Sequence, residues 1–243
     1  MPFLSSIKKT ILIACPMATL LLFLVFYNII STTPPCYVLP ASSTRNTTNC
    51  IIIDAGHGGI DPGKIGVNNS LEKDINLSIA LKLKPLLEKE GFTVILTRED
   101  DTMLSSKNSS SPKRDDMIAR AELIEKHMPY ITISIHQNSF TDASITGPQV
   151  FYYENSTDGE YLASCLQSSL NTELLPIHPR TIQANDSYFL LKETPTPTVI
   201  VECGFLSNFY EANLLCDSNY QLKIAEAICH GILAYQKEPV LNN

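Results

Sequence analysis

Residues 51–59 constrain the fold most, because they pass directly from a buried strand into a glycine-rich loop. Three consecutive isoleucines at positions 51–53 are typical of a strand that is covered on both faces. The glycines that follow permit positive φ angles and close approach of the backbone. His57 lies in this loop, where a histidine next to a strand end suggests a site at the edge of a sheet. An ordinary loop histidine is the simpler interpretation when this segment is considered alone.

Strand and helix patterns alternate along the rest of the chain. Apolar residues recur at helical spacing in four segments, and short β-branched or alternating runs lie between them. We expect helices that begin near Leu71, with Ser70 as the cap, and at 113–126, 158–174 and 220–235; we expect strands at 50–54, 92–97, 131–135, 149–153, 187–191 and 198–201. This alternation predicts an α/β fold with three αβα layers. Its central sheet is expected to be mixed but mostly parallel, with about six strands and helices on both faces.

The N-terminal part of the chain differs from the rest. Residues 11–30 form a run of 20 residues without a charge, which is long enough to span a bilayer, and the lysines at 8 and 9 favour a cytoplasmic start. We expect a membrane anchor or signal segment at 1–31, an extended linker at 32–49, a catalytic domain at 50–237 and a short tail at 238–243. A cleaved signal peptide is the alternative to an anchor. Either one places the domain outside the cytoplasm.

Charge and cysteine usage exclude some classes of function. The net charge is −7, and residues 1–45 carry three basic side chains and no acid, so the remaining 15 basic and 25 acidic residues give a net charge of −10. An acidic domain argues against nucleic acid as a partner. The seven cysteines lack Cys-x-x-Cys spacing, which argues against a zinc site built from thiolates. Cys216 and Cys229 lie in apolar patterns and are expected to be buried.

Three predicted strands end at side chains that can bind metal or move protons: His57, His136 and Glu202. Ligands in open α/β sheets bind beyond the carboxyl ends of the strands, so these groups can converge. Glu72, in the first turn of a predicted helix, is a fourth candidate. Two imidazoles and one carboxylate are a zinc-binding set that leaves a position open for water. Each residue also has an ordinary alternative: a helix-dipole carboxylate, half of a salt bridge, or a hydrogen-bonded loop histidine.

Five stretches resemble motifs of one enzyme family and occur in the family's order. They are IDAGHGG at 53–59, EKDINL at 72–77, LTR at 96–98, ISIHQN at 133–138 and VECGFLSN at 201–208. Over about residues 49–235 the chain resembles the zinc-dependent N-acetylmuramoyl-L-alanine amidases of the third amidase family. The resemblance implies that His57, Glu72 and His136 hold one Zn²⁺ and that Glu202 is the catalytic carboxylate. Glu125 departs from the asparagine that relatives often have.

Shorter motifs resemble the CwlD-type branch, whose members act in bacterial spore formation. They are residues 113–116, Arg120, 151–153, Arg180 and 188–192. The branch implies hydrolysis of the amide between the lactyl group of N-acetylmuramic acid and L-alanine in spore-cortex peptidoglycan, as the first step towards muramic δ-lactam. It also implies a location in the cortex-facing compartment of the developing spore. We further expect an accessory exported protein or lipoprotein that stabilises the domain or its zinc.

Four further residues are candidates for substrate binding, although a structural role suits each of them as well. Arg98, Arg120 and Arg180 can meet carboxylates of the substrate or form structural salt bridges. Asn138 can orient the substrate or brace its own loop.

Two other functions are compatible with the sequence. One is a non-catalytic peptidoglycan-binding or scaffold protein that keeps the fold. The other is a wall peptidase in which Cys203 is the nucleophile and His136 the base. Cys203 follows Glu202 directly, so it points to the opposite face of the sheet if the strand continues.

Overall fold

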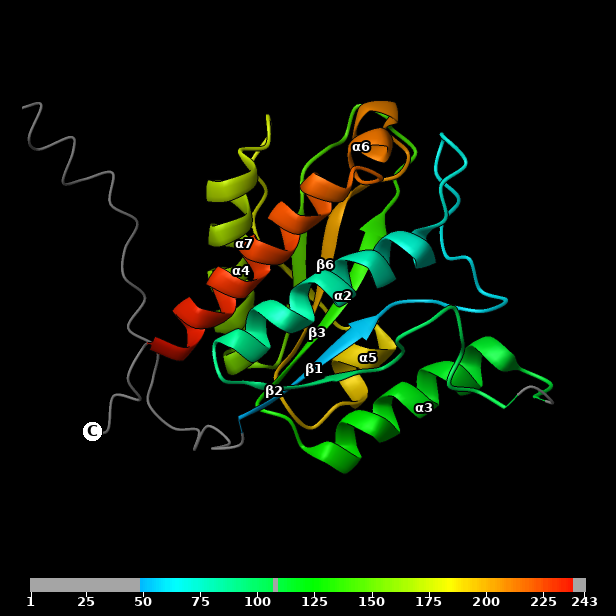
Figure 1. The fold of residues 1–243 in the computed structure, drawn as a ribbon, viewed down its shortest axis with the longest axis vertical. Helices are drawn as coiled ribbons and strands as arrows, with labels where there is room; N and C mark the ends of the chain where they lie inside the picture. The colour runs from blue at the N-terminus through cyan, green and yellow to red at the C-terminus, as the bar shows by residue number, and fades with distance from the viewer. Residues whose placement is uncertain (1–48, 107–108, 238–243) are drawn as a thin grey trace, which may run out of the picture. The chain divides into compact units, whose positions relative to one another are not determined.

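Six strands form one mixed sheet in the computed structural model, which describes residues 49–106 and 109–237 (Figure 1). Their order is β2-β1-β3-β6-β4-β5. The strands are β1 (Cys50–Ala55), β2 (Thr93–Leu96), β3 (Ile131–Asn138), β4 (Gln149–Tyr153), β5 (Gln183–Asn185) and β6 (Thr198–Phe205). All neighbours pair in parallel except β4 and β6, which are antiparallel. The predicted α/β fold with a mostly parallel sheet of about six strands is confirmed.

Helices cover both faces of the sheet, as predicted (Figure 1). The helices are α2 (Glu72–Lys89), α3 (Pro112–His127), α4 (Thr157–Leu174), α5 (Phe189–Glu193), α6 (Phe209–Leu214) and α7 (Ser218–Lys237). Buried residues of α2, α4 and α7 share the large core with one face of the sheet, and residues of α3 and α5 share a small cluster with the other face. The second face is therefore the less completely covered one.

The alternation of side chains along β1 and β3 assigns residues to these two faces. Odd-numbered residues such as Ile51 and Ile133 are fully buried in the large core. Even-numbered residues point the other way, where Ile52 packs against Ile124 of α3 and Leu190 of α5. Each fully buried isoleucine contributes about 1.5–3 kcal/mol. Because the large core supplies most of the stabilisation from burial, the less covered face of the sheet can carry polar groups near the strand ends.

Both β3 and β6 continue beyond the predicted strand ends. We predicted ends at His136 and Glu202, but β3 extends to Asn138 and β6 to Phe205, with a register shift between His136 and Asn138. The two chemically important residues therefore lie within the strands, where they are partners in the pairing of β3 with β6.

The predicted strand at 187–191 is wrong. The short strand lies earlier, at Gln183–Asn185, and residues 189–193 form α5. The side-chain oxygen of Asn185 accepts hydrogen bonds from the backbone N–H groups of Ser187 and Tyr188, which turns the chain away from the sheet. Leu190 then packs into the cluster with Ile52.

Two smaller predictions are also wrong. Ser70 does not cap α2, because Leu71 occupies the cap position and the Ser70 hydroxyl donates to Asn68 Oδ1. Cys216 is exposed, whereas Cys229 is buried as expected.

The predicted anchor at 1–31 and tail at 238–243 lie outside the described residues, as does the linker at 32–49 up to its last residue. Within residues 49–106 and 109–237, no helix has the length and apolar character needed to cross a membrane.

Candidate metal centre and catalytic site

Three predicted metal ligands come together above the carboxyl ends of β1 and β3. His57 lies in the loop after β1, Glu72 is the first residue of α2, and His136 lies on β3. One ligand atom from each lies within 4.8 Å of the others. The Glu72 Oε1 atom is 3.2 Å from His57 Nε2 and 2.9 Å from His136 Nδ1. The two imidazole rings stand edge to face with their centroids 4.9 Å apart.

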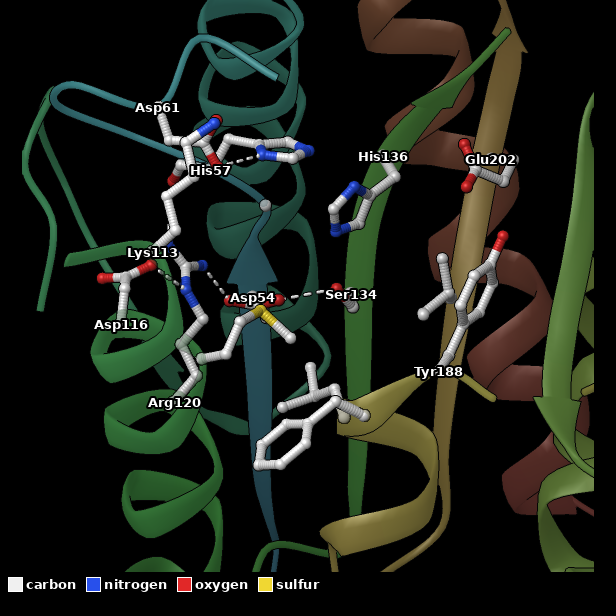
Figure 2. A pocket seen from close by; sticks show the side chains of 15 residues that line it. Asp54, His57, Asp61, Lys113, Asp116, Arg120, Ser134, His136, Tyr188 and Glu202 are labelled. Carbon is white, nitrogen blue, oxygen red and sulfur yellow. Dashed lines mark hydrogen bonds and ion pairs between the residues drawn. The ribbon is translucent and has the colours of Figure 1, made fainter. Parts of the chain in front are cut away.

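Hydrogen bonds from outside the cluster fix the orientation of two of the three candidate ligands, His57 and Glu72. His57 uses its other ring nitrogen, Nδ1, to contact Asp61 Oδ2 at 2.7 Å (Figure 2). The second carboxylate oxygen of Glu72 accepts from the backbone N–H of Lys64 at 2.7 Å. A histidine held by a carboxylate through one nitrogen, with the other nitrogen free, is the usual arrangement behind a metal ligand. Asp61 was not predicted from the sequence.

Two glycines allow the ligands to approach one another. A side chain at Gly56 would occupy the space of the His136 ring. Gly63 has φ of +67°, and a Cβ atom there would lie 2.6 Å from Glu72 Oε2 and 2.7 Å from His57 Cδ2. The glycine-rich loop is therefore required by the close packing around the three ligands.

The charges within the cluster suit a bound cation. Burial raises the pKa of Glu72, but hydrogen bonds and charge from His136 and His57 outweigh it and hold the pKa well below its usual range. Burial likewise opposes protonation of His57, yet Glu72 and Asp61 raise its pKa to about 9. Contacts with Glu72 also raise the pKa of His136, again against burial. The carboxylate of Glu72 thus favours positive charge on the two histidines beside it, and a divalent cation can supply that positive charge instead. The nitrogen and oxygen donors are of the types that such a cation binds.

Glu202 lies beside this cluster on β6. It is the direct partner of His136 in the parallel register, and Figure 2 shows its carboxylate facing His136. The side chain is buried, and its Oε2 atom has no hydrogen-bond partner among the described residues. Burial, followed by the negative charge of Glu72, raises the pKa of Glu202 to about 7, although the two histidines lower it. A carboxyl group with a pKa near neutrality can both accept and donate a proton.

A pocket of about 320 Å³ opens onto Glu202 and the two histidines. Its floor is the less covered face of the sheet, where Asp54 and Ser134 lie next to His136 (Figure 2). One wall comes from α3, with Lys113 and Met117. The other wall comes from the start of α5.

Two residues that we predicted to contact the substrate, Arg98 and Arg120, instead bind groups of the protein itself. Arg98 is buried and donates to backbone carbonyl groups, including Ala55 O at 2.9 Å and Lys73 O at 2.7 Å. Arg120 is 1% exposed. It forms ion pairs with Asp54 and Asp116 and donates to His57 O at 2.7 Å. His57 has a positive φ of 64°. We interpret Arg120 as a positioning residue that holds the backbone of His57.

The other two predicted substrate contacts lie towards β4 and β6. Arg180 is half-buried, donates to Gln149 Oε1 at 3.0 Å and stacks over the Phe205 ring at 5.3 Å. Asn138 accepts from the backbone N–H of Ser139 through its side chain, at 2.7 Å.

Cys203 lies on the opposite face of the sheet from Glu202. It is fully buried in the large core with α2 and α7, and burial raises the pKa of its thiol far above the usual range. The Cys203 nucleophile that we considered cannot reach the pocket that Glu202 lines.

Comparison with known proteins decides the family. The model of the N-acetylmuramoyl-L-alanine amidases, the third amidase family, matches residues 51–234. The chain belongs to this family. It is therefore an enzyme that hydrolyses the bond between N-acetylmuramic acid and L-alanine of peptidoglycan, and the alternative of a non-catalytic scaffold is set aside.

Individual relatives agree with the predicted branch. The germination-specific N-acetylmuramoyl-L-alanine amidase of Bacillus subtilis is 37% identical over 191 residues, which cover 77% of this chain and 80% of that protein. The CwlD amidase of Clostridioides difficile, solved in complex with the GerS lipoprotein, is 42% identical with a TM-score of 0.74, covering 77% of this chain and 98% of that one. The catalytic domain of CwlV from Paenibacillus polymyxa is 29% identical with a TM-score of 0.68, covering 77% and 97%. The resemblance to CwlD-type amidases is confirmed.

Proposed function

We propose that this amidase is zinc-dependent, that His57, Glu72 and His136 are its metal ligands and that Glu202 is its acid–base catalyst. The observation that carries the proposal is the convergence of two imidazoles and one carboxylate, with a second, unpaired carboxylate facing them. Three protein ligands leave a fourth position for water or substrate, which is the arrangement of catalytic zinc. Residues 50–237 form the catalytic domain in this proposal.

The residues of the chain divide the chemistry between them. Zinc, when bound, lowers the pKa of water from about 15.7 to about 7 and polarises the amide carbonyl. Asp61 holds the His57 ring so that Nε2 is directed towards Glu72. Glu202 accepts a proton from the attacking water and then delivers it to the alanine nitrogen. The second transfer is needed because an amine leaves an amide only after protonation.

The test is a Glu202→Gln variant assayed next to the wild-type protein and a metal-depleted sample. We expect the variant to retain one zinc per chain while turnover falls by about 10²–10⁴-fold, the usual contribution of a general acid–base group. Activity of the depleted sample should return on addition of zinc. Products are identified by mass spectrometry as peptides that begin with L-alanine plus glycan without peptide. A Glu202→Gln variant with full activity would refute the assignment.

We also propose that the substrate is spore-cortex peptidoglycan and that the reaction is the first step towards muramic δ-lactam. The similarity to a germination-specific amidase supports this role. A cortex substrate requires an extracytoplasmic domain, consistent with a membrane segment at residues 11–30. Muropeptides from spores of a strain that lacks this chain should contain no muramic δ-lactam. Unchanged lactam content would contradict the cortex role without affecting the amidase activity.

An accessory lipoprotein is the partner that we propose. The 42% identical CwlD amidase forms a complex with a lipoprotein, which supports a similar partner for this chain. The measurement is zinc content and activity of the purified domain with and without the corresponding exported lipoprotein. Equal zinc content and equal activity would argue against such a partner.

A further inference from the structure

Tyr188 is held firmly at the edge of the pocket, immediately before α5. Its backbone N–H donates to Asn185 Oδ1 at 2.7 Å, and its carbonyl accepts from the N–H of Lys192. Its ring packs against Phe151 of β4, with centroids 5.5 Å apart. Leu190, two residues later within α5, is buried. These contacts fix the ring, although 37% of the residue is exposed.

The hydroxyl group of Tyr188 points into the catalytic site. Figure 2 shows it directed towards the Glu202 carboxylate, on the side away from His57 and Asp61. The residue lines the same pocket as His57, His136 and Glu202. An amide bound between the two histidines and Glu202 therefore lies near this hydroxyl group.

Other donors in the pocket wall are already engaged. The Ser134 hydroxyl donates to Asp54 at 2.6 Å, and Lys113 forms an ion pair with Asp61 at 2.7 Å. Arg120 is saturated by carboxylates and carbonyl groups, as described above. Among the described residues that line the pocket, Tyr188 is thus the neutral donor on the α5 side that is directed at the reacting groups.

The reaction creates a need for such a donor. When water adds to the amide carbon, the C=O bond loses its π character and negative charge develops on the oxygen. A donor placed for that oxygen stabilises the transition state more than the ground state. Glu202 cannot fill this role while it is ionised, because a carboxylate only accepts hydrogen bonds.

We propose that the Tyr188 hydroxyl donates a hydrogen bond to the carbonyl oxygen of the scissile amide. This hydrogen bond becomes stronger as the carbon becomes tetrahedral. The proposal rests on the function proposed above, in which Glu202 and a bound metal ion act on that amide. Burial, and then the charges of Glu202 and Glu72, raise the pKa of Tyr188, so the hydroxyl keeps its proton at neutral pH. Tyr188 is therefore a catalytic residue for this reaction, with no proton transferred from it.

The test compares Tyr188→Phe with the wild-type enzyme on soluble, peptide-bearing glycan strands. The substitution keeps the ring contact with Phe151 and removes only the hydroxyl. We expect kcat to fall by about 10²–10³-fold with KM within about twofold, the pattern for a contact made in the transition state. Tyr153→Phe is the matched control, because the Tyr153 hydroxyl contacts only Asn155 among the described residues. This control should keep wild-type kcat.

To separate the possible outcomes, we would measure the zinc content and the thermal transition of each protein and assay a Glu202→Gln variant in parallel. An unchanged kcat in Tyr188→Phe, with Glu202→Gln inactive, would overturn the role of Tyr188 and leave the proposed function intact. An active Glu202→Gln variant would instead refute the proposed function. Loss of zinc or of the folded state in Tyr188→Phe would assign the residue a structural role and would also overturn the proposal.

Discussion

Replacing Arg120 by methionine should destabilise the domain severely. The guanidinium group is 1% exposed and pairs with the buried carboxylates of Asp54 and Asp116. Removing one member of a buried ion pair leaves an uncompensated charge and costs about 3–5 kcal/mol. For a domain of this size, that cost lowers Tm by about 6–20 °C. Methionine has a similar length, so loss of packing contributes little.

The pH dependence of this loss follows from Asp54. Burial raises its pKa, but the charge of Arg120 and hydrogen bonds from Ser134 and Thr97 outweigh burial and bring it from 3.8 to about 2. A depressed pKa stabilises the folded state above the unfolded pKa, and this stabilisation, about 2 kcal/mol, is lost as the pH falls towards 2. Without Arg120, burial of Asp54 is less well opposed and its pKa is higher than in the wild-type protein, so the variant loses less stability than the wild type as the pH falls. The difference between the two proteins should therefore be larger at pH 7 than at pH 4.

Urea unfolding at both pH values measures this difference, provided that the m-value is unchanged. Arg114→Met is the matched control, since Arg114 is an exposed residue of the same helix, and its effect should stay within about 0.5 kcal/mol. Adding Asp54→Asn to Arg120→Met should recover part of the loss, because it removes an unpaired charge. If Arg120→Met had the same free energy of unfolding as the wild-type protein at pH 7, this account of the buried ion pairs would be refuted.

Three further predictions concern the metal centre. Asp61→Asn should weaken zinc binding by about 10–100-fold, as is usual when the carboxylate behind a ligand histidine is removed, and competition with a chromogenic chelator measures this. Gly63→Ala should lower the affinity for zinc, because a Cβ atom at position 63 meets Glu72 and His57. Gly91→Ala is the control and should leave the affinity unchanged, because a Cβ atom there meets nothing within 4 Å. Zinc titration of both variants tests this. Glu72 and Asp61 raise the pKa of His57 to about 9 despite burial, so zinc binding should release protons. The affinity for zinc should therefore rise by about tenfold per pH unit for each proton released. Calorimetry in buffers of different ionisation enthalpy should detect this release, and heats that do not depend on the buffer would contradict it.

The sequence predicted the features that depend on regular patterns. Alternating β-branched runs and helical periodicity sufficed for the α/β fold, since the consecutive isoleucines of β1 need cover on both faces. The same alternation explains why Glu202 and Cys203 face opposite sides. The convergence of His57, Glu72 and His136 followed from strand ends and family motifs together, because the spacing alone left each residue with an ordinary alternative.

Other features depend on contacts that no local pattern reveals. The α5 segment contains apolar and aromatic residues that suit a strand, but the Asn185 side chain turns the backbone before Tyr188. A structural salt bridge was one of the two roles considered for Arg120, but no local pattern identified its partner Asp54, which is 66 residues away. Asp61 lies four residues after His57 in a loop, where the conformation of two glycines decides whether it reaches the ring. A carboxylate that closely follows a histidine in such a loop is the one signal that was available.

The central claim is that one divalent ion sits between His57, Glu72 and His136, within reach of Glu202. A crystal structure of the zinc-loaded protein, with anomalous data collected on both sides of the zinc absorption edge, tests this claim most directly. The account predicts a single strong peak bounded by His57 Nε2, Glu72 Oε1 and His136 Nδ1. A peak bound by other side chains, or no peak between these three atoms at saturating zinc, would contradict it.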